Sequence, residues 1–75
     1  MAVVRLDCLH EPCPIPLLKG LKMLETMKPR DVLVLLTDHN CATSNVLDWA
    51  RKKGYNIKLE DLGGGEWEIY IEKTR

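Results

Sequence analysis

The chain has 75 residues, of which 45% are hydrophobic and 29% are charged, and its 11 basic and 11 acidic side chains balance to zero net charge. This size allows one domain, residues 1–75, with a single core, and the composition is that of a folded globular chain. Because binding to phosphate backbones relies on excess basic charge, the balanced charge argues against stable nucleic-acid binding.

No apolar run reaches the roughly 18 residues of a membrane helix, and the start "MAVVRLD" lacks the features of a signal peptide. We therefore expect a cytoplasmic protein without membrane insertion. Three cysteines are too few, and odd in number, for a disulfide framework. In a reducing compartment we expect them to be reactive, metal-binding or packed.

Hydrophobic periodicity predicts the element order strand, helix, strand, helix, strand, strand. The predicted elements are strands at 2–7, 31–37, 55–62 and 66–73, helices at 17–28 and within 38–54, and a glycine turn at 63–65. Strand–helix–strand units pair in parallel, whereas the final hairpin is antiparallel. The sequence thus predicts an α+β fold, a βαβαββ two-layer sandwich with both helices on one face of a mixed four-stranded sheet.

The reactive side chains gather in two loops of this topology. Cys8, His10 and Cys13 follow the first strand, and His39 and Cys41 follow the second. If these two strands are parallel, both loops lie at the same sheet edge. In open α/β sheets, ligands and chemistry tend to occur at that edge.

Cys13 has the most suggestive position, in the stretch "CLHEPCPIP". With Pro14 as the first helical residue, Cys13 is expected to be the N-cap, and the Ile15 amide is free to point at its sulfur. Two prolines, Pro14 and Pro16, are expected to stiffen the turn that holds Cys13 at the helix start. The positive helix N-terminus would favour the nucleophilic thiolate. The alternative is a small buried cysteine at an ordinary helix start.

The other candidates have weaker patterns. We expect Cys8 to be a packed small residue at the strand end. Cys41 lies near the start of the second helix and is a cap, a core residue or a resolving thiol; we favour a structural role. His10 and His39 are expected to be exposed loop residues, with a charge or hydrogen-bond role toward Cys13 as the alternative.

The stretch "LDCLHEPCPIPLL" resembles the TusA/SirA-like sulfur-carrier family, whose motif is Leu-Asp, a short loop usually with a glycine, and Cys-Pro-x-Pro opening a helix. The residues that match are Leu6, Asp7, Cys13, Pro14 and Pro16. The stretch "MKPRDVLVLLTDHNCATSNV" resembles the family's second strand and acidic loop, with Asp38 at the matching place. The resemblance extends to the last strand pair and so covers nearly the whole chain.

The resemblance implies a fold similar to the C-terminal domain of a bacterial translation initiation factor. It implies a sulfur carrier or sulfurtransferase, rather than a multiple-turnover enzyme, whose Cys13 accepts a sulfane sulfur as a persulfide. Pro14, Pro16 and Asp7 would support this site, with no cofactor or metal. The implied partners are a sulfur-donor protein (a cysteine desulfurase, a rhodanese or a thiosulfate-linked protein) and a sulfur-acceptor protein. The carrier itself is expected to be a monomer.

Two positions depart from the family pattern. His10 stands where the family has its loop glycine, and Pro12 replaces an often basic residue. The loop is closest to the YeeD and YedF branches. This leaves tRNA thiolation, thiosulfate use, selenium metabolism and cofactor synthesis open as destinations of the sulfur.

Alternative functions use the same residues. Cys8, five residues before Cys13, could resolve a persulfide into a disulfide and release sulfide. The cysteines and histidines could instead hold zinc, although their spacing does not match paired-knuckle sites. An RNA- or protein-interaction module of the same fold is the third alternative.

Overall fold

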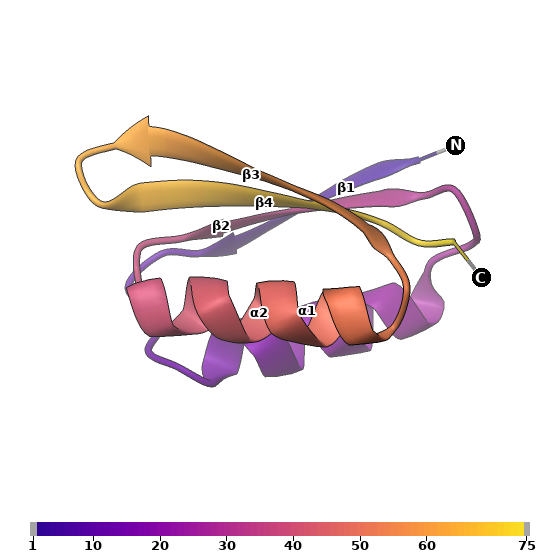
Figure 1. Ribbon diagram of the computed structural model, residues 1–75, viewed down its shortest axis with the longest axis horizontal. Helices are drawn as coiled ribbons and strands as arrows, with labels where there is room; N and C mark the ends of the chain where they lie inside the picture. Colours follow the sequence, from indigo (N-terminus) through magenta and orange to yellow (C-terminus); the bar gives the residue numbers. More distant parts are fainter. Residues whose placement is uncertain (1, 75) are drawn as a thin grey trace.

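The computed structural model describes residues 2–74 and confirms the predicted fold. Two helices cover one face of a four-stranded sheet (Figure 1). The elements are β1 Val3–Cys8, α1 Ile15–Thr26, β2 Val32–Thr37, α2 Asn40–Lys52, β3 Asn56–Gly63 and β4 Glu66–Glu72. Among the described residues, no helix is long and apolar enough to span a bilayer.

The sheet has the order β1-β2-β4-β3, with β1 parallel to β2 and the other pairs antiparallel. The parallel register pairs Val3 with Val32 and ends with Cys8 opposite Thr37. The carboxyl ends of β1 and β2 therefore stop side by side. Both helices begin close to this edge and run back along the sheet (Figure 1).

The core lies between the helices and the central strands. Leu33 and Leu35 of β2 and Ile69 and Ile71 of β4 are fully buried. They alternate along their strands because successive side chains point to opposite faces, and the helix-covered face is apolar. Leu24 of α1 meets the same cluster, which ties the first helix to the two central strands.

Gly20 lies where α1 packs tightly against β2. A Cβ at this position would lie 3.1 Å from Leu35 Cδ1, tighter than ordinary contact. The sequence shows only that glycine weakens a helix by about 1 kcal/mol relative to alanine. The structure supplies the reason for that loss: the missing side chain lets the helix lie close to the buried strand.

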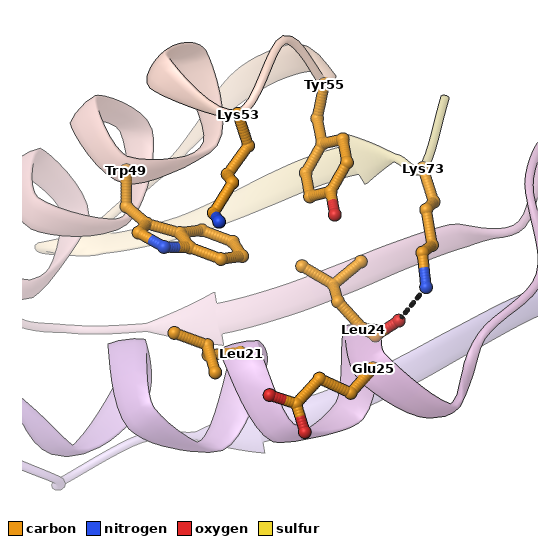
Figure 2. A pocket seen from close by; sticks show the side chains of 7 residues that line it. All are labelled: Leu21, Leu24, Glu25, Trp49, Lys53, Tyr55 and Lys73. Carbon is orange, nitrogen blue, oxygen red and sulfur yellow. Dashed lines mark hydrogen bonds between the residues drawn. The ribbon is translucent and has the colours of Figure 1, made fainter. Parts of the chain in front are cut away.

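The free backbone carbonyls at the C-terminal end of α1 accept hydrogen bonds from a lysine near the C-terminus of the chain. Lys73 Nζ donates hydrogen bonds to the carbonyls of Leu24 (2.6 Å) and Met27 (2.8 Å). A cation here also complements the negative end of the helix dipole. Figure 2 shows the Lys73–Leu24 hydrogen bond beside a groove between the C-terminal halves of the helices, bordered by Trp49 and Tyr55. No cysteine lines this groove.

We predict that Gly20→Leu destabilises the fold. The overpacking of Leu35 costs about 1–3 kcal/mol and exceeds the roughly 1 kcal/mol gained in helix propensity. Urea unfolding measures the loss, with Lys22→Leu on the exposed side of the same helix as the control. Equal stability of wild type and Gly20→Leu would contradict the close packing.

Candidate functional site

The candidate site lies where the loops after β1 and β2 meet. Cys8 and Thr37 are the paired last residues of these strands, and Asp38 follows Thr37 directly. The backbone N–H of His10 donates to Asp38 Oδ1 at 3.0 Å, across 28 residues of chain. Parallel pairing thus brings together the two loops that the sequence placed at one edge.

Cys13 contacts the first turns of α2. Asn45 Nδ2 donates a hydrogen bond to Cys13 Sγ at 2.7 Å and also lies 3.9 Å from Cys41 Sγ. Cys13 is half-buried, whereas Cys41 is exposed. The two cysteines and the amide form one cluster, here called the Cys13–Asn45–Cys41 cluster.

Asn45 is the site residue that the sequence analysis missed. An asparagine on a helix is usually solvated, so the residue type alone does not indicate a site. The spacing does indicate one, because Asn45 follows Cys41 by four residues, and residues at this spacing lie on one helix face. A cysteine near a helix start followed one turn later by an amide is the pattern to look for.

The expected N-cap is wrong by one residue. The Pro14 carbonyl accepts the first helical hydrogen bond, from Leu18 N–H at 3.1 Å, so Pro14 is the N-cap and Cys13 precedes it. The Ile15 N–H does not face the sulfur, because it closes a turn onto the Pro12 carbonyl at 2.9 Å. The Cys13–Pro14 peptide bond is cis.

The ionisation of Cys13 also differs from the expectation. A hydrogen bond with the Cys41 thiol, together with partial desolvation, raises the pKa of Cys13 above its ordinary value, and the Asn45 amide opposes this shift. The protonated thiol is therefore the resting form at neutral pH.

Asp38 pairs with both histidines and links the two loops through His10. His39 Nδ1 lies 2.8 Å from Asp38 Oδ1, and His10 Nδ1 lies 3.3 Å from Asp38 Oδ2. Partial burial alone would raise the pKa of Asp38, but the bonds from His10 and His39 outweigh burial and lower it. Within the described residues, neither histidine hydrogen-bonds to Cys13; both face the carboxylate instead.

His10 occupies a backbone position that favours glycine. Its φ of 66° lies in the left-handed region, which glycine adopts without strain and histidine adopts more often than most residues. The side chain is 89% exposed, so the tight turn, not packing, sets this position. Asp7 Oδ1 accepts the Leu9 N–H at 2.9 Å and fixes the start of the same loop.

Cys8 lies in the core. It is fully buried, and desolvation, with the charge of Glu11 adding and that of Lys19 opposing, raises its pKa to about 11. Glu11 pairs with Lys19, while its Oε2 is buried without a hydrogen-bond partner. Burial and a raised pKa both disfavour the nucleophilic thiolate at this position. The structure therefore does not support Cys8 as a second reactive thiol.

The zinc alternative finds no support in the geometry. Across residues 2–74, no three or more side chains of histidine, cysteine, aspartate or glutamate are arranged to hold a metal ion. Asp38 draws both histidines toward itself, and Cys8 points into the core.

Comparison with known proteins identifies the family. The family model described as "Sulfurtransferase TusA" matches residues 4–73. The chain belongs to the TusA family. It is 31% identical to a protein of Thermotoga maritima over 68 residues, 89% of this chain and 86% of the relative. It is 31% identical to TsuB of Escherichia coli over 75 residues, 99% and 100% of the two chains.

Both relatives have the name "Putative sulfur carrier protein", as does a protein of Methanocaldococcus jannaschii that is 30% identical over 97% of each chain. Among solved structures, the SirA-like protein from Desulfitobacterium hafniense superposes with a TM-score of 0.87 at 25% identity. The superposition covers 96% of this chain and 99% of that one. Sequence and fold thus agree on a TusA/SirA-like domain.

We predict that Cys41→Ala lowers the pKa of Cys13. Removing the thiol that favours the protonated form increases the thiolate at neutral pH, so Cys13 is alkylated faster and the midpoint of its rate profile moves to lower pH. Mass spectrometry of the Cys13 peptide follows the reaction from pH 6 to 11, in a Cys8→Ala background.

Ser44→Ala, at an exposed neighbour on the same helix, is the matched control and should leave the midpoint unchanged. An unchanged or higher midpoint in Cys41→Ala would show that the two thiols do not interact.

Proposed function

We propose that this TusA-family protein relays sulfur, with Cys13 accepting a sulfane sulfur as a persulfide and passing it to an acceptor. The observation that supports this most is the position of Cys13. It is the cysteine of the Cys-Pro-x-Pro motif, and it is half-exposed just before α1. Its sulfur accepts a hydrogen bond from the side-chain amide of Asn45. Cys8, by contrast, is sealed in the core.

The proposed transfer is a thiol exchange. The Cys13 thiolate attacks the outer sulfur of a donor persulfide, and a bond forms from Cys13 Sγ to that sulfur. The sulfur–sulfur bond of the donor breaks, and its electron pair leaves with the donor thiolate. An acceptor thiolate later attacks the same outer sulfur and displaces Cys13 as thiolate. No external oxidant or reductant is needed.

The surroundings of Cys13 have separate roles in this step. The Asn45 N–H stabilises negative charge on the sulfur, both when it attacks and when it leaves. The turn through Pro12 and Pro14 fixes the approach of the sulfur to α2. Asp38 keeps the two loops in contact. Because the pKa of Cys13 is raised, its thiol is protonated in the free protein at neutral pH. The rate at which Cys13 accepts sulfur should therefore increase as the pH rises.

The donor and acceptor must reach Cys13 from outside. Ile15 and Leu18, in the first turn of α1, are 37% and 56% exposed, and Lys22 lies exposed one turn beyond Leu18. These residues offer an apolar contact with a basic edge next to the motif cysteine. We propose that a sulfur-donor protein (a cysteine desulfurase, a rhodanese or a thiosulfate-linked protein) and an acceptor protein dock here in turn on a monomer.

The test is intact mass after the reduced protein is incubated with thiosulfate or with a cysteine desulfurase and cysteine. We expect a gain of one sulfur atom, reversed by a reducing thiol. Cys13→Ser should reduce the adduct at least about tenfold, because the first acceptor of the sulfur is lost. Cys8→Ala should load like wild type. Equal loading of Cys13→Ser and wild type would overturn the proposal.

A further inference from the structure

We propose that Cys41 is a second sulfur-bearing residue, which takes the sulfane sulfur from the Cys13 persulfide and presents it at the exposed edge of the site. This inference rests on the proposed function of Cys13. It assigns Cys41 a chemical role in place of the structural one that the sequence favoured.

The geometry of the Cys13–Asn45–Cys41 cluster supports the transfer. One amide nitrogen, Asn45 Nδ2, lies 2.7 Å from Cys13 Sγ and 3.9 Å from Cys41 Sγ. The two sulfurs therefore face the same amide nitrogen, from the loop before α1 and from the first turn of α2. A sulfur atom added to Cys13 extends about 2 Å beyond Sγ, and both cysteine sulfurs lie within 3.9 Å of Asn45 Nδ2.

The exposures of the two residues give the transfer a direction. Cys13 is half-buried between α1 and α2, while Cys41, in the first turn of α2, is exposed. A persulfide on Cys13 is partly shielded by the cluster. The same sulfur on Cys41 is open to an attacking acceptor. Cys8 offers no such position, because it is fully buried.

The step balances within the protein. The Cys41 thiol gives its proton to water, and its thiolate attacks the outer sulfur of the Cys13 persulfide. A bond forms between Cys41 Sγ and that sulfur, and the bond from Cys13 Sγ breaks. The electron pair stays on Cys13, which takes up a proton. One sulfur–sulfur bond replaces another, so the two forms should be populated within about tenfold of each other.

Asn45 has a positioning role in this exchange. Negative charge moves from Cys41 to Cys13 as the sulfur moves the other way, and the same N–H group lies beside both ends. A hydrogen bond to a charged sulfur is stronger than one to a neutral thiol. Asn45 can thus donate a hydrogen bond to whichever sulfur is negatively charged, without a rearrangement of the backbone.

Peptide mapping tests the proposal. The full chain in a Cys8→Ala background is loaded with thiosulfate or with a desulfurase and cysteine, and its perthiols are blocked with an alkylating agent. Trypsin then separates Cys13, in peptide 6–19, from Cys41, in peptide 31–51. We expect alkylated perthiol on both peptides, in a ratio that does not depend on protein concentration.

Two variants make the test specific. Cys13→Ser should remove most of the perthiol from Cys41, because Cys13 is the entry point. Cys41→Ser combined with Ser44→Cys keeps the thiol count but moves the exposed thiol away from Asn45. We expect Cys13 to load in this variant and the new cysteine to carry at least about tenfold less perthiol than Cys41 does.

Each remaining outcome decides against the inference. Perthiol on Cys13 alone would leave the proposed function standing and overturn the role of Cys41. Perthiol on the relocated cysteine at the wild-type level would show unspecific exchange. A disulfide between the two peptides with release of sulfide would make Cys41 a resolving thiol instead. Perthiol on neither peptide would overturn the proposed function and the inference together.

Discussion

The site depends on the parallel pairing of β1 with β2. This pairing ends with Cys8 beside Thr37, so both chains leave the sheet at the same edge and enter helices that begin there. It sets the 28-residue link between His10 and Asp38 and the 32-residue link between Cys13 and Asn45. An antiparallel first strand would send Cys13 to the opposite end of the sheet from α2 and leave no cluster.

The chemistry of Cys13 is set by α2 more than by its own helix. In the expected picture, the N-terminus of α1 activates the sulfur. In the structure, the Ile15 amide is used in a turn, and the pKa of Cys13 responds to Cys41, to partial desolvation and to Asn45. Cys41 favours the thiol and Asn45 favours the thiolate. The proposed relay uses both forms of Cys13, because the thiolate attacks the donor and is released again when the acceptor takes the sulfur.

The fold could be predicted from the sequence because its signals are local. The apolar run at Leu33 and Leu35 predicts a buried strand, and the glycines at 63–65 predict the hairpin. The place of β4 between β2 and β3 could not be derived, since several strand orders satisfy the same pattern. The left-handed turn at His10 was hidden because histidine gives a weaker signal for that conformation than glycine.

The candidate site was predictable only in part, for a related reason. The topology placed both cysteine loops at one edge, and the motif singled out Cys13. The partners of its sulfur are 28 and 32 residues further along the chain, and which side chain reaches it depends on how α1 and α2 pack. The same packing decides that Cys8 is buried and Cys41 exposed, a distinction that their spacing does not contain.

The proposed relay places the sulfane sulfur on Cys13, at its contact with the Asn45 amide. The most direct measurement follows the side-chain amide of Asn45 by NMR before and after the protein is loaded with one sulfane sulfur. We expect the Asn45 amide signals to shift on loading and to return when the sulfur is removed by a thiol, and we expect Cys13→Ser to abolish the change. If the Asn45 signals of the loaded protein do not move, the sulfur lies elsewhere and the role of Cys13 is wrong.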